Sequence, residues 1–214
     1  MTALTVHTCC QYLTAGGNWR DVDHNARVIV KIAKGKPFNG YFDTHLDGKP
    51  VRLNENNLDV GLDKIARVLS AKLRELTDRP VILVPVPNSG ACVNTTPQFR
   101  TLLLAEAVAK YSQGLATASP AILWKVPRTA QHQSSGYRQA SHFIPNLSVP
   151  RRTPSPVVLI DDVITSGSQM LACTYLLRRN GVEVPFGMAV GRTTQVQTPQ
   201  ALEWVSEEIT QLII

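Results

Sequence analysis

Three short runs of apolar residues constrain the fold of this chain more than any other feature of its sequence. Each run is four residues long, which is too short for a buried helix, and each is followed by polar or turn-forming residues. The runs are Val81–Val84, Ala121–Trp124 and Val157–Ile160. A continuous apolar run of this length is typical of a strand buried on both faces, as strands are in a parallel sheet.

Stretches with helical periodicity separate these runs. Apolar residues recur at helical spacing from Leu58 to Leu76, and shorter patterns predict one helix from Phe99 and another that opens at Ser168. Val182–Val190 is expected to return as a strand, and Pro199–Leu212 to form a closing amphipathic helix. Strands alternating with helices in a chain of 214 residues predict an α/β fold with a mostly parallel, doubly wound sheet.

The N-terminal part of the chain follows a different pattern. Val28–Ile32 is a run rich in β-branched residues, and Asp47 and Gly48 are suited to the turn of a hairpin. We therefore expect residues 1–56 to form a small β-rich lobe, and residues 57–214 to form the α/β domain.

The segment that follows the third apolar run has the chemistry of a ligand site. It begins with Asp161 and Asp162 and continues to Thr165-Ser166-Gly167-Ser168, at the end of a strand where α/β proteins bind ligands. Small residues at a helix N-terminus can direct backbone N–H groups at a phosphate, and carboxylates accept hydrogen bonds from sugar hydroxyls. The structural alternative is a strand, a turn and an N-cap at Ser168 without a ligand. The G-x-x-x-x-G-K-[ST] phosphate loop is absent, so nucleoside triphosphate hydrolysis has no support.

The stretch Val157–Gln169, VVLIDDVITSGSQ, resembles the phosphoribosyl pyrophosphate signature of the type I phosphoribosyltransferases. The resemblance implies that Asp161 and Asp162 hold the ribose 2′ and 3′ hydroxyls and a Mg²⁺ cofactor. It implies transfer of a 5-phosphoribosyl group from phosphoribosyl pyrophosphate to a nitrogen acceptor, with release of pyrophosphate. The residues implied to surround the 5′-phosphate are Val163, Thr165, Ser166, Gly167 and Ser168.

A second, looser resemblance concerns the loop after the first apolar run. The stretch Val84–Gly90, VPVPNSG, lies where the family has its pyrophosphate-binding turn, and its Val-Pro-Val-Pro is similar to the ComF-like branch, which is linked to DNA uptake. The long polar segment 126–156 is similar to that branch's basic, glutamine-containing segment. The resemblance implies that a basic side chain, Arg128 or Arg138, stabilises the departing pyrophosphate and acts in catalysis with the two acids. The candidate residues in the two segments are Pro87, Asn88, Ser89, Gly90, Arg128, Gln131, Gln133 and Arg138.

The chain also departs from these families. ComF-like proteins carry a cysteine-rich zinc element near the N-terminus, whereas the four cysteines here have no metal-site or disulfide spacing. Thr165 stands where 6-oxopurine salvage enzymes have an acid, which argues against guanine or hypoxanthine as the acceptor. The resemblance covers about Val81 to Arg192, and residues 1–56 are expected to act as a hood on the acceptor side.

Two other functions use the same signature, and a third uses adjacent acids. They are a non-catalytic sensor of a phosphoribosyl ligand, a ComF-like protein in DNA uptake or a nucleic-acid-linked defence pathway, and a receiver domain. A receiver domain is disfavoured because its acids should close the first strand of the domain.

Charge and composition limit the kinds of partner that are expected. The 22 Lys and Arg exceed the 16 Asp and Glu, giving a net charge of +6 that favours an anionic partner. Because the excess is scattered, phosphorylated small molecules compete with nucleic acid as an explanation. We expect phosphoribosyl pyrophosphate, pyrophosphate and a nucleobase or other nitrogen acceptor as partners, with a homodimer left open. Without a signal sequence or a run of 18 apolar residues, no membrane is expected and the cytoplasm is the expected location.

Overall fold

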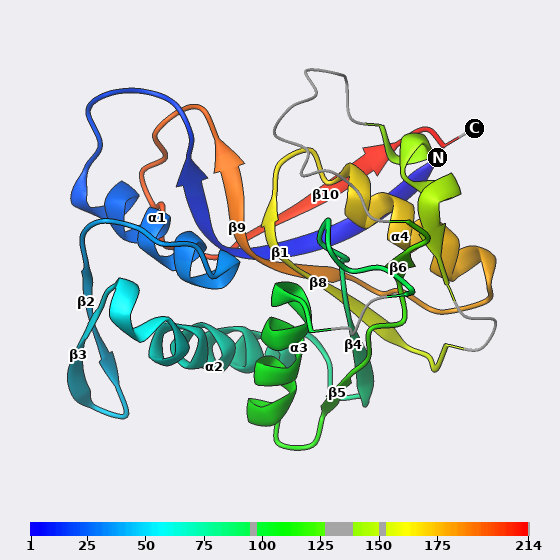
Figure 1. Cartoon of the computed structure of the whole chain (residues 1–214), viewed down its shortest axis with the longest axis horizontal. Helices are drawn as coiled ribbons and strands as arrows, with labels where there is room; N and C mark the ends of the chain where they lie inside the picture. The colour runs from blue at the N-terminus through cyan, green and yellow to red at the C-terminus, as the bar shows by residue number, and fades with distance from the viewer. Residues whose placement is uncertain (95–97, 127–138, 150–152, 214) are drawn as a thin grey trace.

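The computed structural model describes residues 1–94, 98–126, 139–149 and 153–213. A six-stranded sheet with the order β10-β1-β9-β8-β4-β5 is its central element (Figure 1). β10 is antiparallel to β1, and all other neighbouring strands are parallel. The expected α/β fold with a mostly parallel sheet is therefore confirmed. The strands are β1 (Thr2–Leu13), β4 (Val81–Pro85), β5 (Ala116–Ala118), β8 (Val157–Ile164), β9 (Gly187–Thr194) and β10 (Val205–Gln211).

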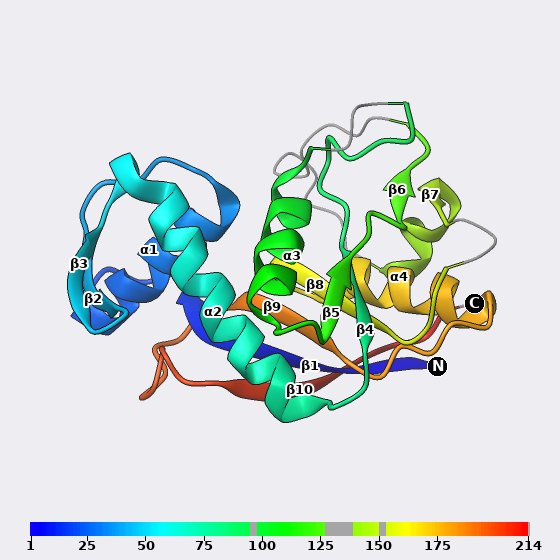
Figure 2. The same ribbon diagram turned by 90° about the horizontal axis from the view of Figure 1, so that it is seen from below.

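Helices cover both faces of this sheet. The apolar run that opens β8 alternates: Val158 and Ile160 face one apolar cluster, whereas Val157 and Leu159 face the other. The first cluster is completed by side chains from α1, α2 and α3, and the second by side chains from α4. Figures 1 and 2 show the resulting layers from two directions. The helices are α1 (Asp21–Lys34), α2 (Leu58–Leu76), α3 (Arg100–Tyr111) and α4 (Ser168–Arg179).

The smaller elements lie at the periphery. The expected hairpin is confirmed: β2 (Phe42–Leu46) pairs with β3 (Lys49–Leu53), and Asp47 and Gly48 both have positive φ at its turn. β6 (Leu123–Trp124) pairs with β7 (Leu147–Ser148) in a separate two-stranded sheet, at the opposite end of the molecule from the hairpin (Figure 2). No helix in the described ranges is both long and apolar enough to span a membrane. Short 3₁₀ turns cover Glu55–Asn57, Ala140–His142 and Ile144–Asn146.

The N-terminal segment differs from its predicted structure in two respects. β1 is not part of a separate lobe but an inner strand of the main sheet, between β10 and β9. The run Val28–Ile32 predicts an extended segment, but it lies in α1, because buried residues on several sides of the helix outweigh the weak β preference of branched side chains. The division of the chain at residue 56 stays a prediction.

Three predicted elements in the rest of the chain need correction. The second apolar run contributes only β6, and β5 takes the edge position of the main sheet instead. β9 begins at Gly187, later than expected from the run that starts at Val182. The predicted helix over Pro199–Leu212 is wrong, because residues 205–211 form β10. Burial alternates from residue to residue along β10, with Ile209 buried, as in a strand. The apolar residues of this segment also fall at helical spacing, which is why the sequence predicts a helix.

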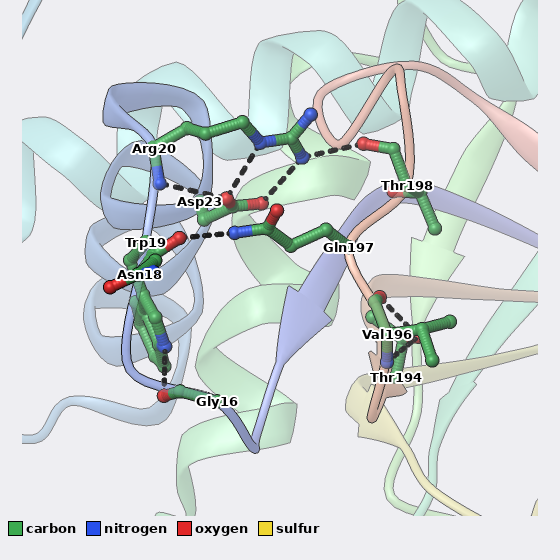
Figure 3. A network of polar contacts seen from close by, with 9 residues as sticks. All are labelled: Gly16, Asn18, Trp19, Arg20, Asp23, Thr194, Val196, Gln197 and Thr198. Atoms are coloured by element: carbon green, nitrogen blue, oxygen red, sulfur yellow. Dashed lines mark hydrogen bonds and ion pairs between the residues drawn. The ribbon is translucent and has the colours of Figure 1, made fainter.

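A polar network ties the segment after β1 to the segment after β9. The buried carboxylate of Asp23 accepts hydrogen bonds from the Arg20 guanidinium at 2.9 Å, and the same guanidinium donates to the Thr198 carbonyl oxygen at 2.6 Å. Gln197 donates to the carbonyl oxygen of Asn18 (Figure 3). Both segments leave the C-terminal ends of parallel strands, so this network fixes one part of the edge on which β8 also ends.

We expect Asp23→Ala to lower the free energy of unfolding by about 2 kcal/mol, because it removes charge-assisted hydrogen bonds to Arg20 and a helix N-terminal contact. The Arg20 guanidinium holds the pKa of Asp23 below its usual range. The contribution is therefore present above about pH 4 and lost as pH falls through the lowered pKa of the folded state. Urea unfolding at pH 7 and pH 3 measures it. Asp21→Ala is the matched control, since Asp21 is an exposed acid in the same helical turn. Equal losses in the two variants would contradict the role of the network.

Candidate functional site

Two adjacent acids lie near the C-terminal end of β8. The apolar run predicts that the strand ends before Asp161 and Asp162, but β8 continues past them to Ile164. The backbone N–H of Asp162 donates to Asp161 Oδ1 at 2.8 Å. Burial raises the pKa of Asp161 well above its usual range, and the neighbouring charge of Asp162 adds to that shift. Burial also raises the pKa of Asp162, against the opposing charges of Lys34, Lys36 and Arg100. An acid pair of this kind is stabilised in its ionised form by a cation or by hydroxyl donors.

The loop between β8 and α4 has the backbone geometry of an anion cradle. Gly167 has a φ of +73° and is the N-cap of α4, so the first N–H groups of the helix open onto the loop. Ser166 and Ser168 join their hydroxyl groups at 2.9 Å. A hollow of about 80 Å³ lies here, which is room for a small anion, since a water molecule takes about 30 Å³ of liquid. Its lining includes Thr165, Ser166, Gly167, Ser168 and also Asp161 and Val163.

Side chains of β9 and β10 contact this loop and fix its conformation. Gln211 of β10 donates to Ser168 Oγ at 2.6 Å. Arg192 of β9 donates to the Thr165 carbonyl oxygen and pairs with Glu207 at 2.5 Å. A Cβ atom placed on Gly167 would lie 2.7 Å from Ile209 Cδ1. The cradle therefore depends on β9 and β10 as well as on its own sequence.

The loop after β4 faces the two acids. The Asn88 carbonyl oxygen accepts from Trp124 Nε1 at 2.8 Å, and the Asn88 side chain accepts from the Gly90 N–H at 3.2 Å. Gln169 in the first turn of α4 donates to the Pro87 carbonyl oxygen at 2.5 Å, so it links this loop to the cradle. A cleft of about 560 Å³ lies between the loop and the acids. Pro87, Asn88, Ser89, Gly90, Asp161, Asp162, Val163 and Gln169 are among its lining residues.

Three cations in the same cleft were missed from the sequence. Lys34 ends α1, Lys36 follows it, and Arg100 begins α3. Arg100 Nε donates to the Ala33 carbonyl oxygen at 2.9 Å, so its guanidinium caps the C-terminus of α1. Burial lowers the pKa of Arg100. The sequence Lys34-Gly35-Lys36 is typical of a helix C-terminus and could have indicated that α1 ends here. It has that meaning only if the preceding residues are helical, and Val28–Ile32 predicts a strand.

The start of α3 connects two walls of the cleft. Thr101 Oγ1 donates to the Val86 carbonyl oxygen at 2.7 Å, next to the loop after β4. Gly35 has a φ of +60°, and a Cβ atom there would lie 3.0 Å from Arg100 Nε. One helical turn thus positions both the loop and the lysine pair.

The structure brings together most of the predicted site residues. All those in the two loops and the acid pair line the cleft or the adjoining hollow, which share Asp161, Val163 and Gln169. Arg128, Gln131, Gln133 and Arg138 lie outside the described residues. In the described ranges, no group of three or more His, Cys, Asp or Glu side chains could hold a metal ion. A metal at this acid pair would therefore need further oxygen ligands from a bound molecule.

Comparisons with known proteins were made on sequence and on structure. No family model matches the sequence, and no match was found among curated proteins. An adenine phosphoribosyltransferase from Leishmania tarentolae aligns at 12% identity over 85% of this chain and 91% of its own, with a TM-score of 0.41. The corresponding enzyme from Saccharomyces cerevisiae aligns at 11% over 78% and 89%, with a TM-score of 0.40. A hypoxanthine phosphoribosyltransferase from Staphylococcus aureus aligns at 13% over 64% and 67%, with a TM-score of 0.37.

Proposed function

We propose that this chain binds the magnesium complex of phosphoribosyl pyrophosphate and transfers its 5-phosphoribosyl group to a nitrogen acceptor. One observation carries the proposal: the acid pair, the small-residue loop and the loop after β4 border two cavities that share Asp161, Val163 and Gln169 in their walls. A molecule that has a diol between two phosphorylated ends matches this order of groups. The small-residue loop alone, or the acids alone, would fit many ligands.

Each part of the site has a role in this proposal. Asp161 and Asp162 accept hydrogen bonds from the ribose 2′ and 3′ hydroxyls. The backbone N–H groups of residues 165–168 hold the 5′-phosphate in the hollow of about 80 Å³. The loop of residues 88–90 and the cations Lys34, Lys36 and Arg100 receive the pyrophosphate. The three cations line the cleft, and the 5′-phosphate hollow has none of them in its wall.

The acid pair also fits a magnesium ion. Carboxylate oxygens are hard ligands, and Mg²⁺ in proteins is held by one or two carboxylates together with substrate phosphates and waters. Asp161 and Asp162 would hold it, and its charge would offset the burial that raises their pKa values. When bound, magnesium supplies charge neutralisation for the pyrophosphate.

The proposed reaction balances without a further reactant. The bond between the sugar carbon C1 and the pyrophosphate oxygen breaks, and its electron pair leaves with pyrophosphate. A bond from the acceptor nitrogen to C1 forms, and the acceptor proton passes to solvent. Lys34, Lys36 and Arg100 stabilise the leaving group because their charges are already in place before it departs.

Calorimetric titration with phosphoribosyl pyrophosphate and Mg²⁺ tests binding, and pyrophosphate release with a panel of nucleobases tests transfer. We expect saturable binding that weakens when ribose 5-phosphate replaces the full ligand, since that molecule leaves the cation side empty. We also expect turnover with one acceptor. Binding without turnover on any acceptor would overturn the reaction in favour of a ligand sensor. Absence of binding would overturn the site itself.

A further inference from the structure

Four cations follow one edge of α1 and continue into the cleft. Arg27, Lys31 and Lys34 are separated by four and three residues, so they lie above one another on the helix, and Lys36 follows the helix end. We name these four residues the α1 cation stripe. Burial and the like charges of the other three cations lower the pKa of Lys31.

The stripe has no acidic ion-pair partner in the described part of the chain. The ion pairs found there use Arg20, Arg52, Arg67, Lys72, Arg79, Lys110 and Arg192. The charges of Lys34 and Lys36 oppose the rise in the pKa values of the acid pair, whereas the contact found for Arg27 is the uncharged ring of Trp19 at 5.7 Å. The outer half of the stripe is therefore a line of positive charge that no acid in the described ranges neutralises by an ion pair.

The stripe joins two cavities. Lys34 and Lys36 line the candidate site, whereas Arg27 lines a second cavity of about 530 Å³ between α1 and residues 38–43. α1 runs from the outer end of the molecule toward its centre, so the stripe leads from the second cavity to the cleft (Figure 1).

The second cavity contains an aromatic surface. Tyr41 is 55% exposed, and the Arg52 guanidinium lies over its ring at 3.9 Å. Arg52 is itself held by Asp43 at 2.8 and 2.9 Å, so the acid in this wall is already paired. A second acid, the exposed Asp21, also lines this cavity at the first position of α1 and forms no ion pair with Arg27. The Tyr41 ring is thus a fixed platform beside the outer cation of the stripe.

We propose that the α1 cation stripe and Tyr41 bind a single-stranded nucleic acid whose end reaches the candidate site. Cations in a line suit a phosphodiester strand, because Arg27 and Lys34 are about 10 Å apart along the helix, and a stacked strand carries one phosphate about every 3.4 Å along its axis. An exposed aromatic ring beside such a line is the other requirement for binding single strands, since bases stack on it. A membrane surface would instead require a broad basic face with apolar side chains around it.

Fluorescence anisotropy with a labelled single-stranded oligonucleotide of about 12 nucleotides tests this proposal, at salt concentrations between about 50 and 200 mM. Arg27→Gln with Lys31→Gln should weaken binding at least tenfold at the lowest salt. It should also reduce the slope of log affinity against log salt by about 1.4, because each phosphate contact contributes about 0.7. Tyr41→Ala should weaken binding about tenfold with an unchanged slope, because stacking involves no counterion.

Two control variants distinguish an effect of the α1 cation stripe from an effect of total charge and from a loss of folding. Lys110→Gln with Arg179→Gln removes the same charge from α3 and α4, and should change affinity less than twofold. Arg27→Lys with Lys31→Arg keeps the charge and should keep binding. Equal losses in the two glutamine variants would overturn the stripe. Competition by tripolyphosphate or anionic vesicles as strong as by unlabelled oligonucleotide, with no effect of Tyr41→Ala, would overturn nucleic acid as the partner.

The stripe and the proposed reaction can fail separately. A wild-type protein that binds the oligonucleotide but no phosphoribosyl pyrophosphate refutes the reaction and leaves the stripe standing. A protein that binds phosphoribosyl pyrophosphate but no oligonucleotide at the lowest salt refutes the stripe alone.

Discussion

Replacing both acids, as Asp161→Asn with Asp162→Asn, is expected to weaken binding of phosphoribosyl pyrophosphate and magnesium at least about 100-fold. Each carboxylate contributes charge-assisted hydrogen bonds worth about 1.5–3 kcal/mol, and every 1.4 kcal/mol is a factor of ten in affinity. The asparagines keep the shape of the side chains but cannot balance the charge of a metal ion. Calorimetric titration of both proteins measures the effect.

The same variant should fold at least as stably as the wild type. Because burial raises the pKa values of both acids in the folded protein, their ionised forms destabilise it. Without ligand, the wild type should therefore lose stability relative to the variant as pH rises from about 4 toward the raised pKa values. Urea unfolding across this pH range measures the difference.

Asp59→Asn with Glu55→Gln is the matched control, because it removes two exposed acids, one in the first turn of α2 and one in the 3₁₀ turn before it. The control should bind the ligand as the wild type does and should show no comparable change of stability with pH. Unchanged affinity in the Asp161 and Asp162 variant would refute the assignment of the sugar site. A loss of folding in that variant would refute the account of the two half-buried acids.

Gly167→Ala is expected to lower the free energy of unfolding by about 2–5 kcal/mol and to weaken phosphoribosyl ligand binding about 100-fold. The positive φ of +73° costs a side chain about 1–2 kcal/mol, and contact with Ile209 at 2.7 Å adds an overpacking cost of about 1–3 kcal/mol. Where the loop backbone moves to relieve this contact, the N–H groups of the cradle are displaced, and a shift of about 1 Å at a site can cost about 100-fold. Thermal unfolding and titration test the two effects.

Gly181→Ala separates backbone strain from the contact. Gly181 has a φ of +77° but open space around its Cβ position. Gly181→Ala should therefore lower the free energy of unfolding only by the cost of backbone strain. Ile209→Val removes the contacting Cδ1 atom and should restore part of the lost stability when combined with Gly167→Ala. Equal losses at the two glycines, with no rescue by Ile209→Val, would show that the strand behind the loop has no role.

The class of fold could be predicted because buried parallel strands leave a strong local signal. Val81–Val84 and Val157–Ile160 are apolar on both faces, and both lie in inner strands of the sheet. The long apolar stripe of α2 was equally clear, and the Asp47-Gly48 hairpin rests on a turn type that few other residues adopt.

The incorrect elements are those whose structure depends on distant neighbours. α1 contains a β-branched run, but Arg100 caps its last carbonyl groups from a position 67 residues away. β10 has apolar residues compatible with either period, and its pairing with β1 decides in favour of a strand. Local patterns cannot reveal such partners.

The residues of the candidate site also fall into a group that could be predicted from the sequence and a group that could not. The acids and the small-residue loop are contiguous in the chain, so their chemistry could be recognised from the order of the residues. Lys34, Lys36 and Arg100 come from two separate helices and meet only because the sheet order places α1 beside α3. The cation stripe was hidden for a related reason, since its members are spaced along a helix that was interpreted as a strand.

The support of the cradle by β10 determines when this site can first exist during synthesis. Gln211 holds Ser168 from 43 residues further along the chain, and Ile209 packs against Gly167. A nascent polypeptide that has emerged only as far as α4 already contains every atom of the loop, but not the strand that gives the loop its shape. Ligand binding should therefore begin only after β10 has left the ribosomal tunnel, so the nascent chain becomes able to bind only near the end of its synthesis.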